Sequence, residues 1–150
     1  MDRFKILVVD DYTFYLESIV KRLEVRKLDV TGVTSGEAAI DLLKKQSFDV
    51  VLLDIKMPGG VDGIETLRKL KKIQPLTEVI LITAYASVET TTEGMKQGAF
   101  DYLLKPVRLE ELLGMIIAAL EKKSKHDKKI SGVMIDDIKR QLCSTSSSEE

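Results

Sequence analysis

The 150-residue sequence has few of the features that characterise disulfide-linked, membrane-spanning or nucleic-acid-binding proteins. Its single cysteine, Cys143, cannot form a disulfide within the chain and suits a reducing cytoplasm. No apolar run approaches the roughly 20 residues that cross a bilayer, and the charged first residues contain no signal peptide. A formal net charge of -1 provides no basic excess for nucleic acid. We therefore expect a cytoplasmic protein with no membrane partner and no direct nucleic acid partner.

Short apolar segments alternate with longer amphipathic ones along most of the chain. Residues 6–9, 50–53 and 79–82 are apolar on both faces and rich in β-branched side chains, which is typical of strands buried in a parallel sheet. Weaker strands fit residues 29–33 and 101–104, and five helical segments lie between or after the strands. Thr34 and Glu37 resemble a capping box that opens the second helix. The alternation predicts an α/β sandwich with a five-stranded parallel sheet and five helices.

The chain divides near residue 122. Residues 1–122 carry the alternating pattern and are expected to form one domain. Residues 123–150 begin as a charged linker, continue with apolar residues at every fourth position that predict a short amphipathic helix, and end in a Ser- and Glu-rich segment expected to be disordered. The wide apolar stripe of residues 109–120 can serve core contact alone or also a dimer interface. The apolar stripe of the tail can extend that interface or fold back on the domain.

Polar side chains follow the predicted strands on one side of the sheet. Ligands of open α/β sheets bind beyond the carboxyl ends of the strands, so these side chains are expected to converge. Taken singly, Asp11 can cap a helix, Asp54 can start a turn and Lys105 can be a solvated strand end. The set is harder to explain in these ways. It consists of Asp10 and Asp11 after the first strand, Asp54 after the third, Thr83 and Ala84 after the fourth, and Lys105 and Pro106 after the fifth.

Three clustered carboxylates predict a hard metal ion. They repel one another, and a bound divalent cation relieves the repulsion. Oxygen ligands without histidine or cysteine suit Mg²⁺, which keeps several of its waters. A metal ion on one side and Lys105 on the other would stabilise a transferring phosphoryl group, and a carboxylate between them could act as its acceptor.

The order and approximate spacing of these residues resemble the receiver domains of two-component signalling. The resemblance covers about residues 5–122, and the local sequence is similar to receivers found in front of NtrC-like transcriptional activators. It implies a flavodoxin-like (CheY-like) α/β fold with strand order 2-1-3-4-5 and five flanking helices. Further matching segments are Met57-Pro58, Asp62-Gly63, Ala86-Ser87-Val88-Glu89-Thr90 and Gly98-Ala99-Phe100-Asp101-Tyr102.

The resemblance also implies a site. Asp54 would accept a phosphoryl group from a sensor histidine kinase or a phosphotransfer protein. Asp11, Asp54 and the backbone carbonyl of Lys56 would ligate Mg²⁺, and Asp10 would act through a metal-bound water. Lys105 would pair with the phosphoryl group, and Pro106 would follow a cis peptide bond that aims Lys105. Thr83 and the adjacent Ala84 would lie at the phosphoryl oxygens, and Tyr102 would rotate inward. Pro58 would be a structural residue.

A receiver of this kind is a regulatory phospho-acceptor rather than an enzyme with a separate substrate. Phosphorylation would change the surface formed by the fourth helix (residues 88–97), the fifth strand (101–104) and the fifth helix (109–120). The output would pass to another protein or to a C-terminal effector domain, including a transcriptional one. The same surface could form a homodimer.

Three alternative functions fit the sequence less well. A phosphohydrolase of the haloacid-dehalogenase type has an Asp-x-Asp pair after its first strand, whereas Asp10 and Asp11 are adjacent and no insertion is large enough for a substrate cap. A nucleotide-binding domain would carry G-x-G-x-x-G or G-x-x-x-x-G-K-[ST] after the first strand, and neither is present. A receiver-like domain that only binds proteins would not need the complete set of acidic residues, Thr83 and Lys105.

Two features depart from the ordinary receiver pattern. Three residues, Gly59-Gly60-Val61, separate Met57-Pro58 from Asp62-Gly63, where the family has two. We expect this loop to be mobile and to alter the Lys56 carbonyl or the lifetime of the phosphate. The fourth helix contains Thr90-Thr91-Thr92, each roughly half a kcal/mol less favourable in a helix than alanine. Either tertiary packing holds this helix, or its weakness eases switching.

Overall fold

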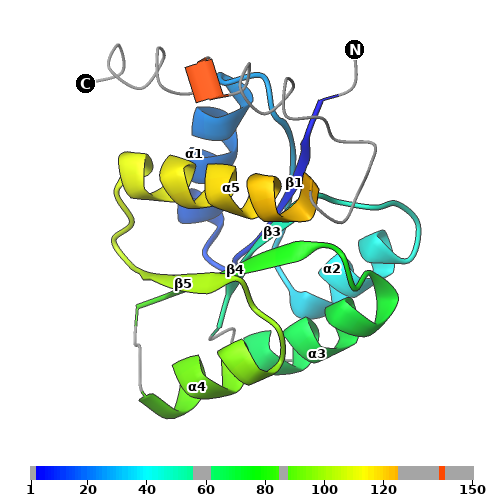
Figure 1. The fold of residues 1–150 in the computed structure, drawn as a ribbon. Coiled ribbons are helices and arrows are strands. Elements are labelled where there is room, and N and C mark those ends of the chain that lie inside the picture. The colour runs from blue at the N-terminus through cyan, green and yellow to red at the C-terminus, as the bar shows by residue number, and fades with distance from the viewer. Residues whose placement is uncertain (1–2, 56–61, 85–87, 125–138, 141–150) are drawn as a thin grey trace.

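The computed structural model describes residues 3–55, 62–84, 88–124 and 139–140, in which strands and helices alternate (Figure 1). The alternation agrees with the pattern of the sequence from the first strand to the fifth helix. In chain order the elements are β1 (Lys5–Val9), α1 (Thr13–Glu24), β2 (Asp29–Val33), α2 (Gly36–Leu43), β3 (Val50–Asp54), α3 (Gly63–Ile73), β4 (Glu78–Thr83), α4 (Val88–Lys96), β5 (Asp101–Leu104) and α5 (Leu109–Ser124).

The five strands form one parallel sheet in the order β2-β1-β3-β4-β5, so the predicted fold class and strand order are confirmed. Every residue of β3 and β4 is buried, because both strands lie inside the sheet with helices over both faces. In the register, Val9 pairs with Leu53 and Thr83 pairs with Leu104. The carboxyl ends of β1, β3, β4 and β5 therefore lie along one edge of the sheet.

Helices cover the sheet in two layers: α1 and α5 lie on one face, and α2, α3 and α4 lie on the other (Figure 1). The pleat of β1 divides its side chains between two hydrophobic cores. Ile6 and Val8 pack in the core under α1 and α5, whereas Leu7 and Val9 pack in the core under α2 and α3. Within the described residues, no helix is long and apolar enough to cross a membrane.

The apolar stripe of α5 faces the core. Leu112, Leu113, Ile116 and Leu120 are buried, and Ile117 is partly buried against the same core. Core contact therefore accounts for the stripe, and a dimer interface on this helix stays a prediction. The whole tail stripe lies outside the described residues. Of the tail, the structure describes residues 139–140, and Lys139 forms an ion pair with Glu121 of α5.

The second helix begins one residue later than the capping-box interpretation requires, so that interpretation is wrong. Ser35 is the N-cap, with an extended backbone, and its hydroxyl accepts a hydrogen bond from the N–H of Ala38 at 3.1 Å. Thr34 is exposed and lies outside the helix. Thr34 and Ser35 both carry a hydroxyl group, so the sequence allows either as the N-cap, and the backbone conformation at Ser35 decides between them.

Gly63 brings the start of α3 against the end of β3, next to the acidic edge. Its N–H donates to the carbonyl of Ile55 at 2.8 Å. A Cβ at this position would lie 2.5 Å from both the carbonyl oxygen of Asp54 and the Cα of Ile55. Backbone atoms cannot rotate away as a side chain can, so only glycine allows this approach.

We predict that Gly63→Ala lowers the free energy of unfolding by about 3 kcal/mol, because the added methyl group forces α3 away from β3. Gly114→Ala is the matched control: a methyl group added to Gly114, in α5, would have no neighbouring atom within 4 Å, and alanine there should raise the free energy of unfolding by about 0.5–1 kcal/mol. Urea unfolding followed by circular dichroism measures both. Equal, small effects would contradict the close approach.

Candidate functional site

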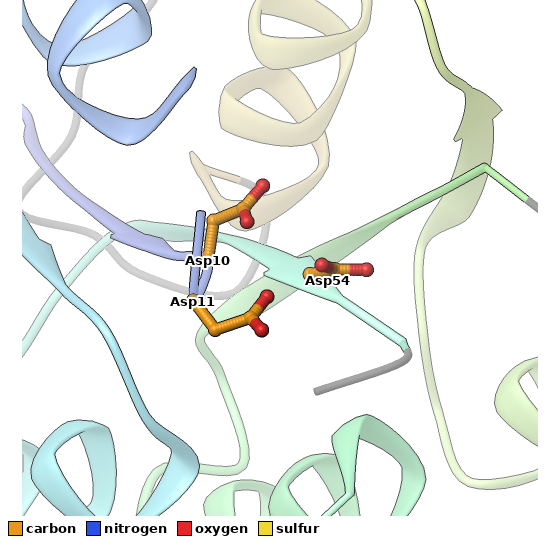
Figure 2. A group of neighbouring side chains, drawn as sticks. All are labelled: Asp10, Asp11 and Asp54. Atoms are coloured by element: carbon orange, nitrogen blue, oxygen red, sulfur yellow. The ribbon is translucent and has the colours of Figure 1, made fainter. Parts of the chain in front are cut away.

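Three carboxylates meet at the carboxyl edge of the sheet (Figure 2). Asp10 and Asp11 follow β1, and Asp54 is the last residue of β3. Each offers an oxygen within 4.8 Å of the oxygens offered by the other two. Asp10 and Asp54 are 3% and 7% exposed, whereas Asp11 is open to solvent. The cluster is thus partly enclosed by the protein and accessible from the side of Asp11.

Asp10, rather than Asp11, makes the local contact with the start of α1. The N-cap of this helix is Tyr12, which makes no side-chain capping bond, so Asp11 does not cap the helix. The Oδ1 atom of Asp10 accepts a hydrogen bond from the N–H of Tyr12 at 2.9 Å. This bond fixes the Asp10 carboxylate and leaves its second oxygen directed at other partners.

Lys105 supplies positive charge to the cluster. Its Nζ lies 2.7 Å from Oδ2 of Asp10 and 3.4 Å from Oδ2 of Asp54. Burial acts to lower the pKa of Lys105, but the hydrogen bonds and negative charges of Asp10 and Asp54 outweigh burial and raise it above its ordinary value. The ammonium group is therefore charged at neutral pH. This single positive charge does not balance three carboxylates, so the cluster keeps an excess of negative charge.

The backbone around Lys105 continues the sheet. The N–H of Lys105 donates to the carbonyl of Thr83 at 2.8 Å, which extends the pairing of β4 with β5 by one step. The Lys105–Pro106 peptide bond is cis. The Nζ contacts with Asp10 and Asp54 place the lysine side chain beside the ends of β1 and β3.

The predicted switch residues lie on both sides of this edge. Thr83 is fully buried at the end of β4, and the following Ala84 is exposed. Tyr102, on the edge strand β5, is 38% exposed and lines a groove of about 450 Å³ together with Met95 and neighbouring residues of α4. Tyr102 therefore points outward in this structure. Its inward rotation stays a prediction, and Lys56, Pro58 and the longer loop at Gly59-Gly60-Val61 lie outside the described residues.

The donor set fits a hard divalent cation. All three side chains offer oxygen, and their excess negative charge after pairing with Lys105 favours a further cation. The carboxylate of Asp11 is exposed, so it can replace its bound water by a metal ion without any unfolding of the protein. The buried carboxylates of Asp10 and Asp54 provide oxygens in fixed positions. The residues present are therefore compatible with Mg²⁺.

Sequence reasoning missed one residue of this site, Tyr15. Its ring lies 4.6 Å below the Nζ of Lys105, measured to the ring centroid. A tyrosine in the first turn of a helix ordinarily indicates packing, and nothing in its spacing pointed to a lysine 90 residues further on.

Residues 6–117 match the response regulator receiver domain family, and the chain belongs to this family. It is 39% identical over 119 residues to the transcriptional regulatory protein ZraR of Escherichia coli (strain K12), and 37% identical over 120 residues to the response regulator protein PilR of Pseudomonas aeruginosa. Both belong to the NtrC-like group, which confirms the narrower resemblance. A receiver domain protein (CheY-like) from Methanospirillum hungatei JF-1 has a similar structure, with a TM-score of 0.81, 32% identity and coverage of 84% of this chain and 100% of that one.

The two relatives are much longer than the region they share with this chain. The alignments cover 79% and 80% of this chain but 27% of each relative. The chain therefore corresponds to the receiver part of a two-component response regulator. Receiver domains are regulatory phospho-acceptor domains that bind Mg²⁺ at an acidic pocket and interact with histidine kinases.

We predict that Lys105→Met lowers the free energy of unfolding by about 1–3 kcal/mol in buffer with a chelator, because it leaves buried carboxylates without their cation. Lys72→Met, which removes an exposed lysine from the last turn of α3, should lower it by at most about 0.5 kcal/mol. Chemical unfolding at neutral pH measures both. Equal effects of the two substitutions would contradict the pairing of Lys105 with the carboxylates.

Proposed function

We propose that Asp54 is the phosphoryl acceptor of this receiver domain and that its phosphorylation controls an output. The observation that carries the proposal is the position of the Asp54 carboxylate, which lies 3.4 Å from the Lys105 ammonium group and within 4.8 Å of oxygens of Asp10 and Asp11. Asp54 is the last residue of β3, whereas Asp10 and Asp11 follow the end of β1. In the strand order, β3 lies between β1 and β5, so Asp54 lies between the acidic pair and the lysine that follows β5.

The chain's own residues can support the transfer as follows. A carboxylate oxygen of Asp54 attacks the phosphorus of a phosphohistidine, the bond from phosphorus to the histidine nitrogen breaks, and an acyl phosphate forms on Asp54. Lys105 exchanges its contact with Asp54 for one with a phosphoryl oxygen, which needs only a small movement of its ammonium group. Thr83, at the end of the adjacent strand, provides a hydroxyl to a second phosphoryl oxygen.

We infer that Asp11 and Asp54 hold Mg²⁺ directly, with the backbone carbonyl of Lys56, and that Asp10 acts through a water molecule. The fixed contacts of Asp10 support this division: one oxygen accepts from the Tyr12 N–H and the other from Lys105. When bound, the ion supplies positive charge to the phosphoryl oxygens. Asp11 has an exposed carboxylate and faces the same cluster.

The output surface that we propose consists of α4, β5 and α5. Tyr102 lines the groove between α4 and β5, so a movement of this side chain would change the groove directly. The donor would be a sensor histidine kinase or a phosphotransfer protein, in the cytoplasm. The recipient would be a separate effector protein, an effector domain on the same polypeptide, such as a transcriptional one, or a second copy of this domain.

Incubation with acetyl phosphate and Mg²⁺ should add one phosphoryl group to the wild-type protein, measured as a gain in intact mass. The gain should disappear in Asp54→Asn and without Mg²⁺. Asp41→Asn, which changes an exposed residue of α2, should keep the full gain. A folded wild-type protein that gains no mass would contradict the proposal and favour a binding module that works without phosphorylation. A gain that persists in Asp54→Asn would move the acceptor elsewhere.

Mg²⁺ should stabilise the wild-type protein, by about 1.4 kcal/mol at a concentration tenfold above its dissociation constant. Asp11→Asn should abolish most of this stabilisation, because it removes one ligand without disturbing a buried contact. Asp41→Asn is again the control and should respond as wild type does. Thermal unfolding over a Mg²⁺ titration measures the effect, and an undiminished response in Asp11→Asn would contradict the assignment of Asp11 as a ligand.

A further inference from the structure

Tyr15 brings an aromatic ring into contact with the charged cluster. It lies in the first turns of α1, half-buried, and belongs to the residues packed against the core under α1 and α5. The Nζ of Lys105 lies over its ring, 4.6 Å from the centroid. This is well within the roughly 6 Å over which a ring face attracts a cation. The contacts of Lys5 with Phe48 and of Lys122 with Phe100, at 5.6 and 5.7 Å, are longer.

The ring of Tyr15, rather than its hydroxyl group, contacts Lys105. The hydroxyl oxygen of Tyr15 is buried beside the backbone of Val107 and has no hydrogen-bond partner of good geometry within the described residues. Burial raises its pKa; the Lys105 charge and the nearby backbone of Val107 act in the opposite direction without reversing the shift. The hydroxyl therefore stays protonated and neutral, and it does not compete with Asp10 or Asp54 for the lysine.

Lys105 exchanges one of its partners during the proposed reaction, and a contact that does not change would hold it in place meanwhile. Its ammonium group sits at the end of a flexible four-carbon chain, and its ion pairs with Asp10 and Asp54 both involve carboxylates of the cluster. In the proposed reaction the lysine leaves Asp54 for the incoming phosphoryl group and keeps its ion pair with Asp10. A neutral ring below the ammonium group continues to attract it at that moment.

We infer that Tyr15 is a positioning residue for the phosphorylation of Asp54, an inference that rests on the proposed function. Its ring holds the Lys105 ammonium group at the place where the phosphoryl group arrives. The lysine is thus held by Asp10, Asp54 and the ring before the transfer, and by Asp10 and the ring while it leaves Asp54. Tyr15 acts through Lys105 and does not itself contact the reacting atoms.

The test measures the rate of mass gain from acetyl phosphate at fixed Mg²⁺. Tyr15→Leu should react about tenfold more slowly than wild type, the size of effect expected for a partly desolvated cation–ring contact. Tyr15→Phe keeps the ring and should restore at least half of the wild-type rate. Phe14→Leu removes an exposed ring from the same turn and should leave the rate within about twofold of wild type.

A double-mutant cycle separates positioning from a general loss of structure. In a Lys105→Met background, Tyr15→Leu should cause no further decrease, because the group it positions is gone. The same tenfold decrease in both backgrounds would overturn the inference and make Tyr15 a packing residue. Tyr15→Met provides a second ring-free variant in case Tyr15→Leu does not fold.

The side-chain NMR signal of Lys105 tests the contact without any phosphorylation. The protons next to its ammonium group should be shifted upfield by the ring in wild type and in Tyr15→Phe, and should lie at the ordinary lysine position in Tyr15→Leu. An unshifted wild-type signal would overturn the inference. Failure of the wild-type protein to take up phosphate would overturn the proposed function, whereas normal uptake with equal rates in wild type and Tyr15→Leu would overturn this inference alone.

Discussion

The pairing of Lys105 with the carboxylates of Asp10 and Asp54 is the interaction on which this edge of the protein depends. Two carboxylates this deeply buried are unfavourable unless they are paired. The lysine compensates part of their charge, and the exposed Asp11 adds a third negative group beside them. The result is a cluster that is stable enough to form and still negative enough to attract a cation.

The parallel sheet makes this cluster available, because it aligns the carboxyl ends of separate strands along one edge. Asp10 and Lys105 lie 95 positions apart in the chain and within hydrogen-bond distance in the fold. Gly63 contributes from the other side: its lack of a side chain lets α3 begin directly against the backbone of Asp54. Strand pairing with Ile82 and the close approach of Gly63 hold the backbone of Asp54, which suits a group that must present an oxygen to an incoming phosphorus atom.

Most of the fold, and much of the site, could be predicted from the sequence. The β-branched runs that end before Asp10, Asp54 and Thr83 fix the strands, and the residues after each run identify the edge where they meet. The cap of α2 was misplaced by one residue, since Thr34 and Ser35 both carry hydroxyls and only the backbone conformation distinguishes them. The contact between Tyr15 and Lys105 could not be predicted, because it depends on how α1 packs beside the end of β5 rather than on local spacing.

In the proposed function, Lys105 exchanges its contact with the Asp54 carboxylate for one with the phosphoryl group that Asp54 carries. A crystal structure of the protein with Mg²⁺ and beryllofluoride, a stable mimic of the phosphoryl group, tests this most directly. We expect an adduct on Asp54, with the Lys105 ammonium group bound to one of its fluorines and no longer within hydrogen-bond distance of the Asp54 carboxylate oxygens. An Asp54 carboxylate without adduct, or an adduct with Lys105 still within hydrogen-bond distance of the Asp54 carboxylate oxygens, would contradict this exchange.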